Sequence, residues 1–179
     1  MNIAYRFLEQ RRDHQPVAFH PFIDMWSHHA TTADLQREVA FPDQLLDESS
    51  VLMVEGDFTR VFHAPQQPFD VVVTHFFIDT ARNLITYLET IYHALEPGGF
   101  WINSGPLLYG SGPFVQLSLD EIVAVAEDMG FEFLETSNMC GEQTLPGKKI
   151  KWMPAIYGSS ERALNMNGYR VQNWVARRR

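Results

Sequence analysis

The stretch from residue 69 to residue 105, FDVVVTHFFIDTARNLITYLETIYHALEPGGFWINSG, decides the fold class of this chain. Its first ten residues, Phe69 to Ile78, are almost all apolar and β-branched or aromatic, which is typical of a central strand covered on both faces. Apolar residues then recur at helical spacing from Leu84 to Leu95, until Pro97-Gly98-Gly99 ends the helix and Phe100-Trp101-Ile102 resumes a strand. This order predicts two parallel strands joined by a helix.

A second helix and a further strand are expected to follow this unit. Ser118 and Glu121 have the spacing of a capping box, and an apolar stripe extends behind them to Met129. Gly130 is placed where a left-handed residue commonly ends a helix, and residues 131–135 form the next expected strand. Because strands and helices alternate, the chain is expected to be an α/β protein with a largely parallel sheet.

The whole chain is interpreted as one domain, residues 1–179, with four parts. Residues 1–49 are expected to form a helix and an irregular N-terminal arm, and residues 50–137 the α/β core. Residues 138–168 carry several glycines and prolines and are interpreted as an excursion or lid, since long excursions in compact domains are often binding loops. Residues 169–179 complete the chain as a last strand with a basic tail.

Composition excludes several classes of protein. With 45% hydrophobic and 20% charged residues the chain is expected to fold, and a net charge of −8 argues against a nucleic-acid partner. No apolar run approaches the roughly 20 residues that a membrane span needs. Cys140 is the only cysteine, which rules out an intrachain disulfide and a thiolate zinc site and favours a reducing compartment. We therefore expect no metal, no membrane partner and a cytoplasmic location, with the nucleus as an alternative.

Polar residues at the carboxyl ends of the expected strands are the first candidates for a site, because ligands of open α/β sheets bind there. They are Asp57 with Phe58, His75 to Asp79, and Asn103. Each has a structural alternative. Asp79 could instead cap the following helix, His75 could be a satisfied core histidine, and residues 56–58 could form only a turn. Neither a G-x-G-x-x-G nor a G-x-x-x-x-G-K-[ST] phosphate loop occurs in the 179 residues.

Two longer blocks carry a family resemblance. FFIDTA at residues 76–81 and PGGFWINSGPLLY at residues 97–109 resemble the carnosine N-methyltransferase family, which is a family of class I, S-adenosylmethionine-dependent methyltransferases. Gly56-Asp57-Phe58 and the closing residues 174–177 fit the same family in the same order, and residues 110–116 resemble its fungal members. The resemblance implies a partial Rossmann-like class I methyltransferase sheet with flanking helices.

The resemblance also implies roles for individual residues. Asp57 and Phe58 would contact the adenosine part of S-adenosylmethionine, and His75 would line the same cofactor. Asp79 matches the carboxylate that holds the methyl-accepting substrate, and Tyr169 matches a tyrosine that contacts it. The implied activity is N-methylation of a small histidine-containing or related amine substrate such as carnosine.

Two departures from the family pattern qualify this expectation. Animal members carry a histidine where this chain has Gly110, and the family's glycine-rich cofactor loop lies upstream of the position that Met1 occupies. The sheet is therefore expected to lack its first two strands and the helix between them, as in a chain truncated at its N-terminus. Cofactor binding would be impaired, and a second copy or a partner chain would cover the open edge. The alternatives are a non-catalytic ligand- or protein-binding module derived from the fold, and a partial gene product.

Overall fold

A computed structural model describes the chain in two compact units. It describes all residues except 1, 12–15, 42–50, 112–113 and 158–160. One unit comprises Met1–Glu55 with Gly158–Asn167, and the other comprises Gly56–Tyr157 with Gly168–Arg179. The sequence predicts one domain, whereas the structure divides the chain into these two units.

The first unit contains two short helices and a two-stranded sheet. These elements are α1 (Asn2–Glu9), β1 (Ala18–Phe19), α2 (Thr32–Leu35) and β2 (Val39–Ala40). The strands pair antiparallel, and the rings of Phe19 and Phe41 stack with centroids 4.8 Å apart. Thr31 and Asp34 form a capping box that starts α2. The helix expected at the start of the chain is confirmed by α1.

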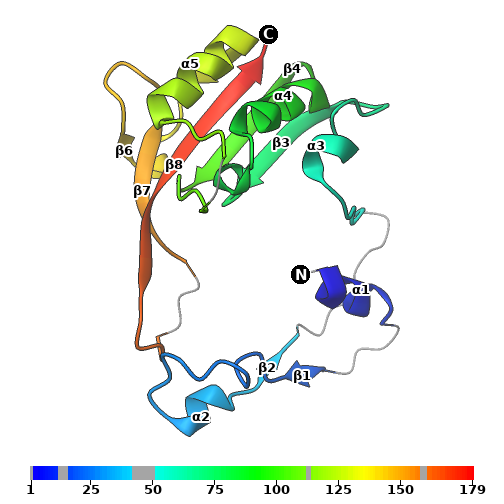
Figure 1. The fold of residues 1–179 in the computed structure, drawn as a ribbon, viewed down its shortest axis with the longest axis vertical. Coiled ribbons are helices and arrows are strands. Elements are labelled where there is room, and N and C mark those ends of the chain that lie inside the picture. Colours follow the sequence, from blue (N-terminus) through cyan, green and yellow to red (C-terminus); the bar gives the residue numbers. More distant parts are fainter. Residues whose placement is uncertain (1, 12–15, 42–50, 112–113, 158–160) are drawn as a thin grey trace. The chain divides into compact units, whose positions relative to one another are not determined.

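The second unit is built on a mixed six-stranded sheet (Figure 1). Its strands are β3 (Phe69–His75), β4 (Leu95–Gly105), β5 (Phe131–Leu134), β6 (Glu142–Gln143), β7 (Lys151–Tyr157) and β8 (Asn167–Arg178). They follow the order β3-β4-β8-β7-β6, and β5 also pairs with β8.

The expectation of a largely parallel sheet is wrong. β3 and β4 pair in parallel, whereas β8 runs antiparallel to both β4 and β5, and β6 runs antiparallel to β7. The two helix crossovers do set β3, β4 and β5 in one direction, as the sequence predicts. The last strand of the chain then inserts between β4 and β5 in the opposite direction. The α/β class is confirmed, and the mixture of directions comes from the antiparallel pairings of β8 with β4 and β5 and of β6 with β7.

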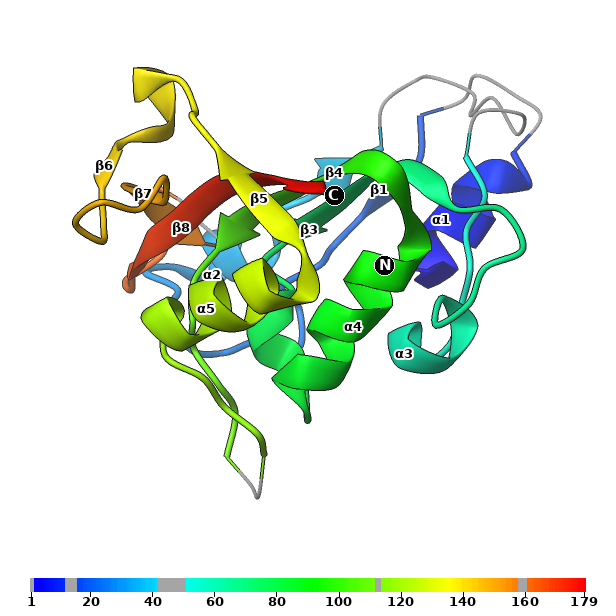
Figure 2. The ribbon, with the colours of Figure 1, turned by 90° about the horizontal axis from the view of Figure 1, so that it is seen from above.

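Two helices cover one face of the sheet (Figure 2). They are α4 (Leu84–Ala94) and α5 (Leu119–Met129). The expected capping box at Ser118 and Glu121 is present, and Gly130 ends α5 with a φ of 105°. The core cluster includes the almost fully buried side chains of Leu84, Leu88, Ile91, Trp101, Ile122, Val123, Ala126, Phe131 and Trp174.

The opposite face of β3 and β4 is apolar and exposed. Val71 pairs with Phe100, and their side chains are 44% and 37% exposed, while Val73 pairs with Ile102 at 64% and 37%. β3 is also an edge strand of the sheet. The expectation that residues 69–78 form a strand covered on both faces is therefore wrong for this structure. That a second copy or a partner chain covers this surface stays a prediction.

The apolar run Val51–Val54 forms no strand. Its residues are largely exposed, with Leu52 at 87%. In the doubly wound order 3-2-1-4-5-6, the third strand pairs only with the second, and the fourth pairs with the first. By the family resemblance, residues 51–54 would correspond to the third strand of that order and β3 to the fourth. Strands for the first and second positions are not among the described residues. No strand of that kind is therefore available to pair with residues 51–54 or with the free edge of β3.

The stretch 138–168, expected as an excursion, contributes β6 and β7 to the sheet. A short 3₁₀ helix, η2 (Asn138–Cys140), precedes them. Gly141 and Gly147 adopt φ values of 100° and 74°, so these glycines mark turns beside and between the strands. A Cβ atom on Gly141 would clash with the carbonyl oxygen of Trp152, which excludes any other residue there. Gly141 therefore marks the turn before β6, and Gly147 marks the turn between β6 and β7.

The basic tail expected after the last strand is wrong as well. Arg177 and Arg178 lie within β8. Arg177 faces Glu132 across the pairing of β5 and β8, and its Nη2 is 2.7 Å from the carboxylate. Arg178 donates from Nη1 to the carbonyl oxygens of Tyr92 and Leu95, between α4 and β4. These arginines thus join the last strand to its neighbours.

The start of β4 holds a pair of acidic residues that predicts a pH effect. The pairing register shifts between Phe69 and Val71, and Pro97-Gly98-Gly99 lies inside β4 at this irregularity. A hydrogen bond with the side chain of Asp70, followed by the repulsion of its charge, raises the pKa of Glu96. A carboxyl group with a raised pKa in the folded state loses its stabilising contribution as the pH rises through that pKa.

Glu96→Gln is therefore expected to raise the melting temperature at pH 7, where the two carboxylates repel each other. The gain in melting temperature should vanish at about pH 4, where the wild-type carboxyl group of Glu96, with its raised pKa, is already protonated. Thermal unfolding followed by circular dichroism at both pH values measures this. Glu89→Gln, at an exposed position of α4, serves as the control. An equal gain at both pH values would show that charge repulsion is not the cause.

Candidate functional site

The candidate site begins at the turn that follows β3. The chain leaves the strand at His75, and Phe76 adopts a left-handed φ of 49°. The backbone N–H of Phe76 donates to the carbonyl oxygen of Ser104 at 3.0 Å, which ties the turn to the end of β4. A 3₁₀ helix, η1 (Ile78–Thr80), follows and carries Asp79. The family block FFIDTA thus occupies the carboxyl end of a strand, where ligands of α/β sheets bind.

Asp79 is buried and binds the loop after β4. The residue is only 8% exposed, and its Oδ2 accepts a hydrogen bond from the backbone N–H of Leu108 at 2.9 Å. The alternative that Asp79 caps the following helix is wrong. Asn83 caps α4, because its Oδ1 accepts from the N–H groups of Ile85 and Thr86. In the described part of the chain, no hydrogen bond is found to Oδ1 of Asp79.

Tyr109 stabilises the same loop. Its hydroxyl donates to the carbonyl oxygen of Leu117 at 2.6 Å. Burial raises the pKa of Tyr109, and the negative charge of Asp79 adds to the increase. The phenol is therefore neutral at physiological pH and available as a donor. Sequence reasoning assigned Tyr109 no role, although it is the last residue of the PGGFWINSGPLLY block.

A cavity of about 520 Å³ lies beside this turn. It is lined by residues 56–59, by Phe77 and Thr80 of the turn, and by the first residues of α4 with Tyr87. The helix α3 (Phe58–Val61) supplies one wall. Asp57 and Phe58, the residues expected at the adenosine, both line the cavity.

Three aromatic rings pack together at this cavity. Phe58 meets Phe77 edge-on at 5.2 Å and Tyr87 at 5.3 Å, while Phe77 and Tyr87 stack at 5.2 Å with their planes 22° apart. Aromatic pairs of this kind stabilise by about 0.5–1.5 kcal/mol beyond their buried area. They fix the position of Phe58 against η1 and α4.

Asp57 caps α3. Its Oδ1 accepts from the backbone N–H of Thr59 at 3.0 Å and from the Thr59 hydroxyl at 2.8 Å. The side-chain and then the backbone hydrogen bond lower the pKa of Asp57, so the carboxylate is ionised. Residues 56–58 therefore do not form only a turn, because Asp57 and Phe58 begin a helix. Oδ2 is 3.7 Å from Nε of Arg60, a long contact that leaves this oxygen able to accept a stronger hydrogen bond.

His75 and Tyr169 belong to a second group of rings. His75 is exposed at the end of β3, so the alternative of a core histidine is wrong. Its ring lies 4.9 Å from that of Phe76, and the Phe76 ring lies 5.9 Å from Tyr169 and stacks on Tyr157 at 5.0 Å. Neither His75 nor Tyr169 lines the cavity that contains Asp57 and Phe58.

The turn after β3 therefore sends two adjacent rings to different places. Phe76 packs against Tyr157 and Tyr169, whereas Phe77 packs against Phe58 and Tyr87. Asp79 follows two residues later in the same turn. The expected cofactor residues 57 and 58 thus lie on one side of the turn, and His75 and Tyr169 lie on the other.

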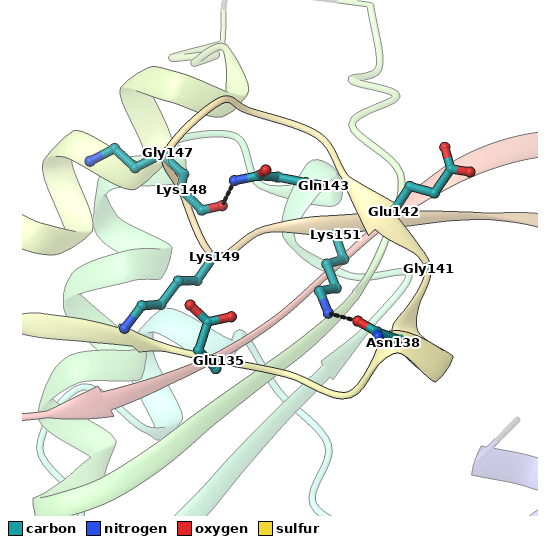
Figure 3. A pocket seen from close by; sticks show the side chains of 9 residues that line it. All are labelled: Glu135, Asn138, Gly141, Glu142, Gln143, Gly147, Lys148, Lys149 and Lys151. Carbon is teal, nitrogen blue, oxygen red and sulfur yellow. Dashed lines mark hydrogen bonds between the residues drawn. The ribbon is translucent and has the colours of Figure 1, made fainter.

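A larger cavity, of about 850 Å³, lies elsewhere in this unit, around η2 and β6 (Figure 3). Its lysines were expected on a solvated loop, but two of them are bound to other residues. Lys148 pairs with Glu127 at 2.7 Å, and Lys151 donates to Asn138 and to a backbone carbonyl. These ammonium groups are already satisfied, and the cavity contains no residue expected in the site. We therefore do not place the chemistry there.

The described residues show neither a metal cluster nor a membrane-spanning helix. Within them, no three histidine, cysteine, aspartate or glutamate side chains are grouped so as to hold a metal ion. None of the described helices is both long and apolar enough to cross a membrane.

The parallel β3-α4-β4 unit, with polar residues at its carboxyl end, defines an α/β protein with a candidate ligand site at the sheet edge. The sequence profile of the family described as carnosine N-methyltransferase matches residues 1–179. The chain belongs to the carnosine N-methyltransferase family, as the two sequence blocks predict.

Individual relatives agree with this assignment. A carnosine N-methyltransferase of Schizosaccharomyces pombe is 35% identical over 77% of this chain and 42% of its own length. The mouse enzyme of that name is 38% identical over 63% of this chain and 30% of its own length. The chain therefore spans less than half of these relatives, and the fission yeast match agrees with a fungal type. Among solved structures, TehB from Haemophilus influenzae matches with a TM-score of 0.42 and 13% identity, over 70% of this chain and 40% of TehB.

Proposed function

We propose that this chain is part of an S-adenosylmethionine-dependent N-methyltransferase that acts on a small histidine-containing or related amine, with carnosine as the model substrate. The observation that carries the proposal is the turn after β3. The turn carries the buried carboxylate of Asp79, its Phe77 and Thr80 line the cavity that contains Asp57 and Phe58, and its Phe76 packs against Tyr157. Family membership supports the reaction class.

The cavity beside α3 fits the adenosine part of the cofactor. Phe58 contributes an apolar ring, and Asp57 contributes an ionised carboxylate with one lightly engaged oxygen. An aromatic wall with a few polar groups is the common form of a site for a flat heterocycle. His75, at the end of β3, would line the cofactor on the other side of the turn. When bound, S-adenosylmethionine supplies a methyl group on a sulfonium.

Asp79 and Tyr169 would hold the acceptor. Methyl transfer needs a neutral nitrogen lone pair in line with the methyl carbon, so the enzyme contributes chiefly orientation. A carboxylate that accepts a hydrogen bond from one imidazole nitrogen leaves the lone pair of the other nitrogen free to attack. As the N–C bond forms and the S–C bond breaks, the imidazole becomes positively charged. The carboxylate stabilises that charge and can accept the imidazole N–H proton.

One observation favours a second candidate, a non-catalytic module derived from the same fold. By the family resemblance, Gly110 occupies a position at which the animal members carry a histidine. Such a module would keep the acceptor site and lose turnover.

A complementation assay separates the two candidates. The chain is co-expressed with the amino-terminal part of the fission yeast relative, and methyl transfer from radiolabelled S-adenosylmethionine to carnosine is measured. The proposed function predicts label in the imidazole ring. A complex that binds both S-adenosylhomocysteine and carnosine but transfers no label would favour the non-catalytic module.

A further inference from the structure

Asn103 is one of the polar residues expected at the strand ends, and the structure buries it. Its side chain is 2% exposed, and it lines neither of the two cavities described above. The residue next to it across the sheet, Thr74 of β3, is 3% exposed. Buried polar side chains of this kind are hydrogen-bonded, so the partners of Asn103 indicate its role.

Three buried side chains form one chain of hydrogen bonds. The indole N–H of Trp101 donates to Oγ1 of Thr74 at 2.9 Å, and this hydroxyl donates to Oδ1 of Asn103 at 2.8 Å. The Nδ2 atom of Asn103 then donates to the backbone carbonyl oxygen of Gln172 at 3.0 Å. We call Trp101, Thr74 and Asn103 the buried network.

Trp101 sets the direction of the buried network. An indole N–H can only donate, so the Thr74 hydroxyl accepts from it and gives its one hydrogen to an acceptor. Oδ1 of Asn103 is the near acceptor, since the carbonyl oxygen of Ile102 lies 3.4 Å away. This arrangement turns the NH₂ group of Asn103 toward β8. Valine has the shape of threonine but cannot replace Thr74, because it has no hydroxyl.

The buried network joins the two strands that carry candidate residues. Thr74 precedes His75 at the end of β3, where the turn of the candidate site begins. Gln172 lies on β8, three residues after Tyr169. β4 lies between these strands in the sheet. Asn103 is on β4 and binds both neighbours, Thr74 on one side and Gln172 on the other.

We propose that Thr74 and Asn103 are positioning residues for methyl transfer. They fix the spacing between β3, which leads to His75, and β8, which carries Tyr169. This inference rests on the proposed function. An in-line transfer depends on the alignment of cofactor and acceptor, and a displacement of about 1 Å can lower the rate about a hundredfold. A break in the buried network should therefore lower kcat and leave the binding of each reactant almost unchanged.

NMR spectroscopy of the 179-residue chain tests the positioning without cofactor, acceptor or turnover. Thr74→Val is expected to move the indole N–H resonance of Trp101 and, two strands away, the resonances of Tyr169. Thr74→Ser keeps the hydroxyl and should leave Tyr169 at its wild-type shifts. If Thr74→Val does not fold, Asn103→Ser, which loses the bond to Gln172, takes its place with the same expectation. A shift confined to Trp101 would overturn the inference.

Kinetics of the complemented protein test the consequence for the reaction. Thr74→Val should lower kcat about tenfold or more, while KM for carnosine and the dissociation constant of S-adenosylhomocysteine stay nearly unchanged. Thr74→Ser should keep the wild-type kcat. A role in stability alone would lower Tm and leave kcat per folded molecule unchanged, and that result beside an active wild type would overturn the inference alone. If the wild-type complex transfers no methyl group, the proposed function fails and the inference fails with it.

Discussion

Asp79→Asn is expected to abolish methyl transfer in the complemented protein while leaving the fold intact. Asparagine keeps the shape of the side chain and an oxygen that can accept the hydrogen bond from Leu108. It removes the negative charge that would orient the acceptor and stabilise its developing positive charge. Loss of such a group commonly lowers the rate by about a hundredfold or more.

Turnover and thermal unfolding are measured on the same preparations. Asp128→Asn, which makes the same change at an exposed position on α5, is the matched control and should leave both unchanged. Asp79→Ala adds a structural comparison, because it leaves the N–H of Leu108 unpaired at a cost of about 1–3 kcal/mol. Wild-type turnover by Asp79→Asn would return Asp79 to a purely structural role.

The elements that the sequence predicts well are those with local signals. α4 and α5 follow from apolar spacing, and the capping box at Ser118 and the αL residue Gly130 fix the ends of α5. β8 could not be placed in the same way. Its position between β4 and β5 depends on pairings such as that of Trp101 with Ala176, which are distant in sequence. No local pattern records such a pairing.

The apolar runs show a related limit. Residues 51–54 and 69–75 both have the composition of strands, but only the second run pairs in this structure. Composition indicates that a segment can form a strand, whereas pairing depends on the presence of neighbours.

The candidate site could be predicted in part. The sequence places Asp57, Phe58 and Asp79 at strand or turn positions; in the structure Asp57 and Phe58 line a cavity beside the turn after β3, and Asp79 lies in that turn. It could not show that Asp79 binds Leu108, since Asp79 and Asn83 are equally good caps by composition. The left-handed backbone conformation of Phe76 could not be predicted from the sequence either, because phenylalanine has no preference for it. The sequence reflects this turn at Gly105, where a Cβ atom would lie 3.0 Å from the backbone nitrogen of Phe76.

The 179 residues by themselves are expected to bind S-adenosylmethionine weakly or not at all. In this class of fold the cofactor rests on a glycine loop after the first strand, and an acidic side chain holds the ribose. Neither is among these residues, and Asp57 and Phe58 would supply one wall only, while His75 lies on the other side of the turn. Charge-assisted hydrogen bonds to the ribose contribute roughly 1.5–3 kcal/mol. With the loop also missing, the loss exceeds about a hundredfold, at about 1.4 kcal/mol for each factor of ten.

Isothermal titration of the monomeric fraction with S-adenosylhomocysteine measures this affinity. Selecting the monomer matters, because the exposed apolar face of β3 and β4 is predicted to lead to self-association. The complex with the amino-terminal part of the fission yeast relative is the positive control and should bind at least about a hundredfold more tightly. Asp57→Asn in that complex should weaken binding if the cavity beside α3 holds the adenosine. A dissociation constant of about 1 µM or lower for the monomer would contradict the prediction. It would show that these 179 residues bind the cofactor without the glycine loop.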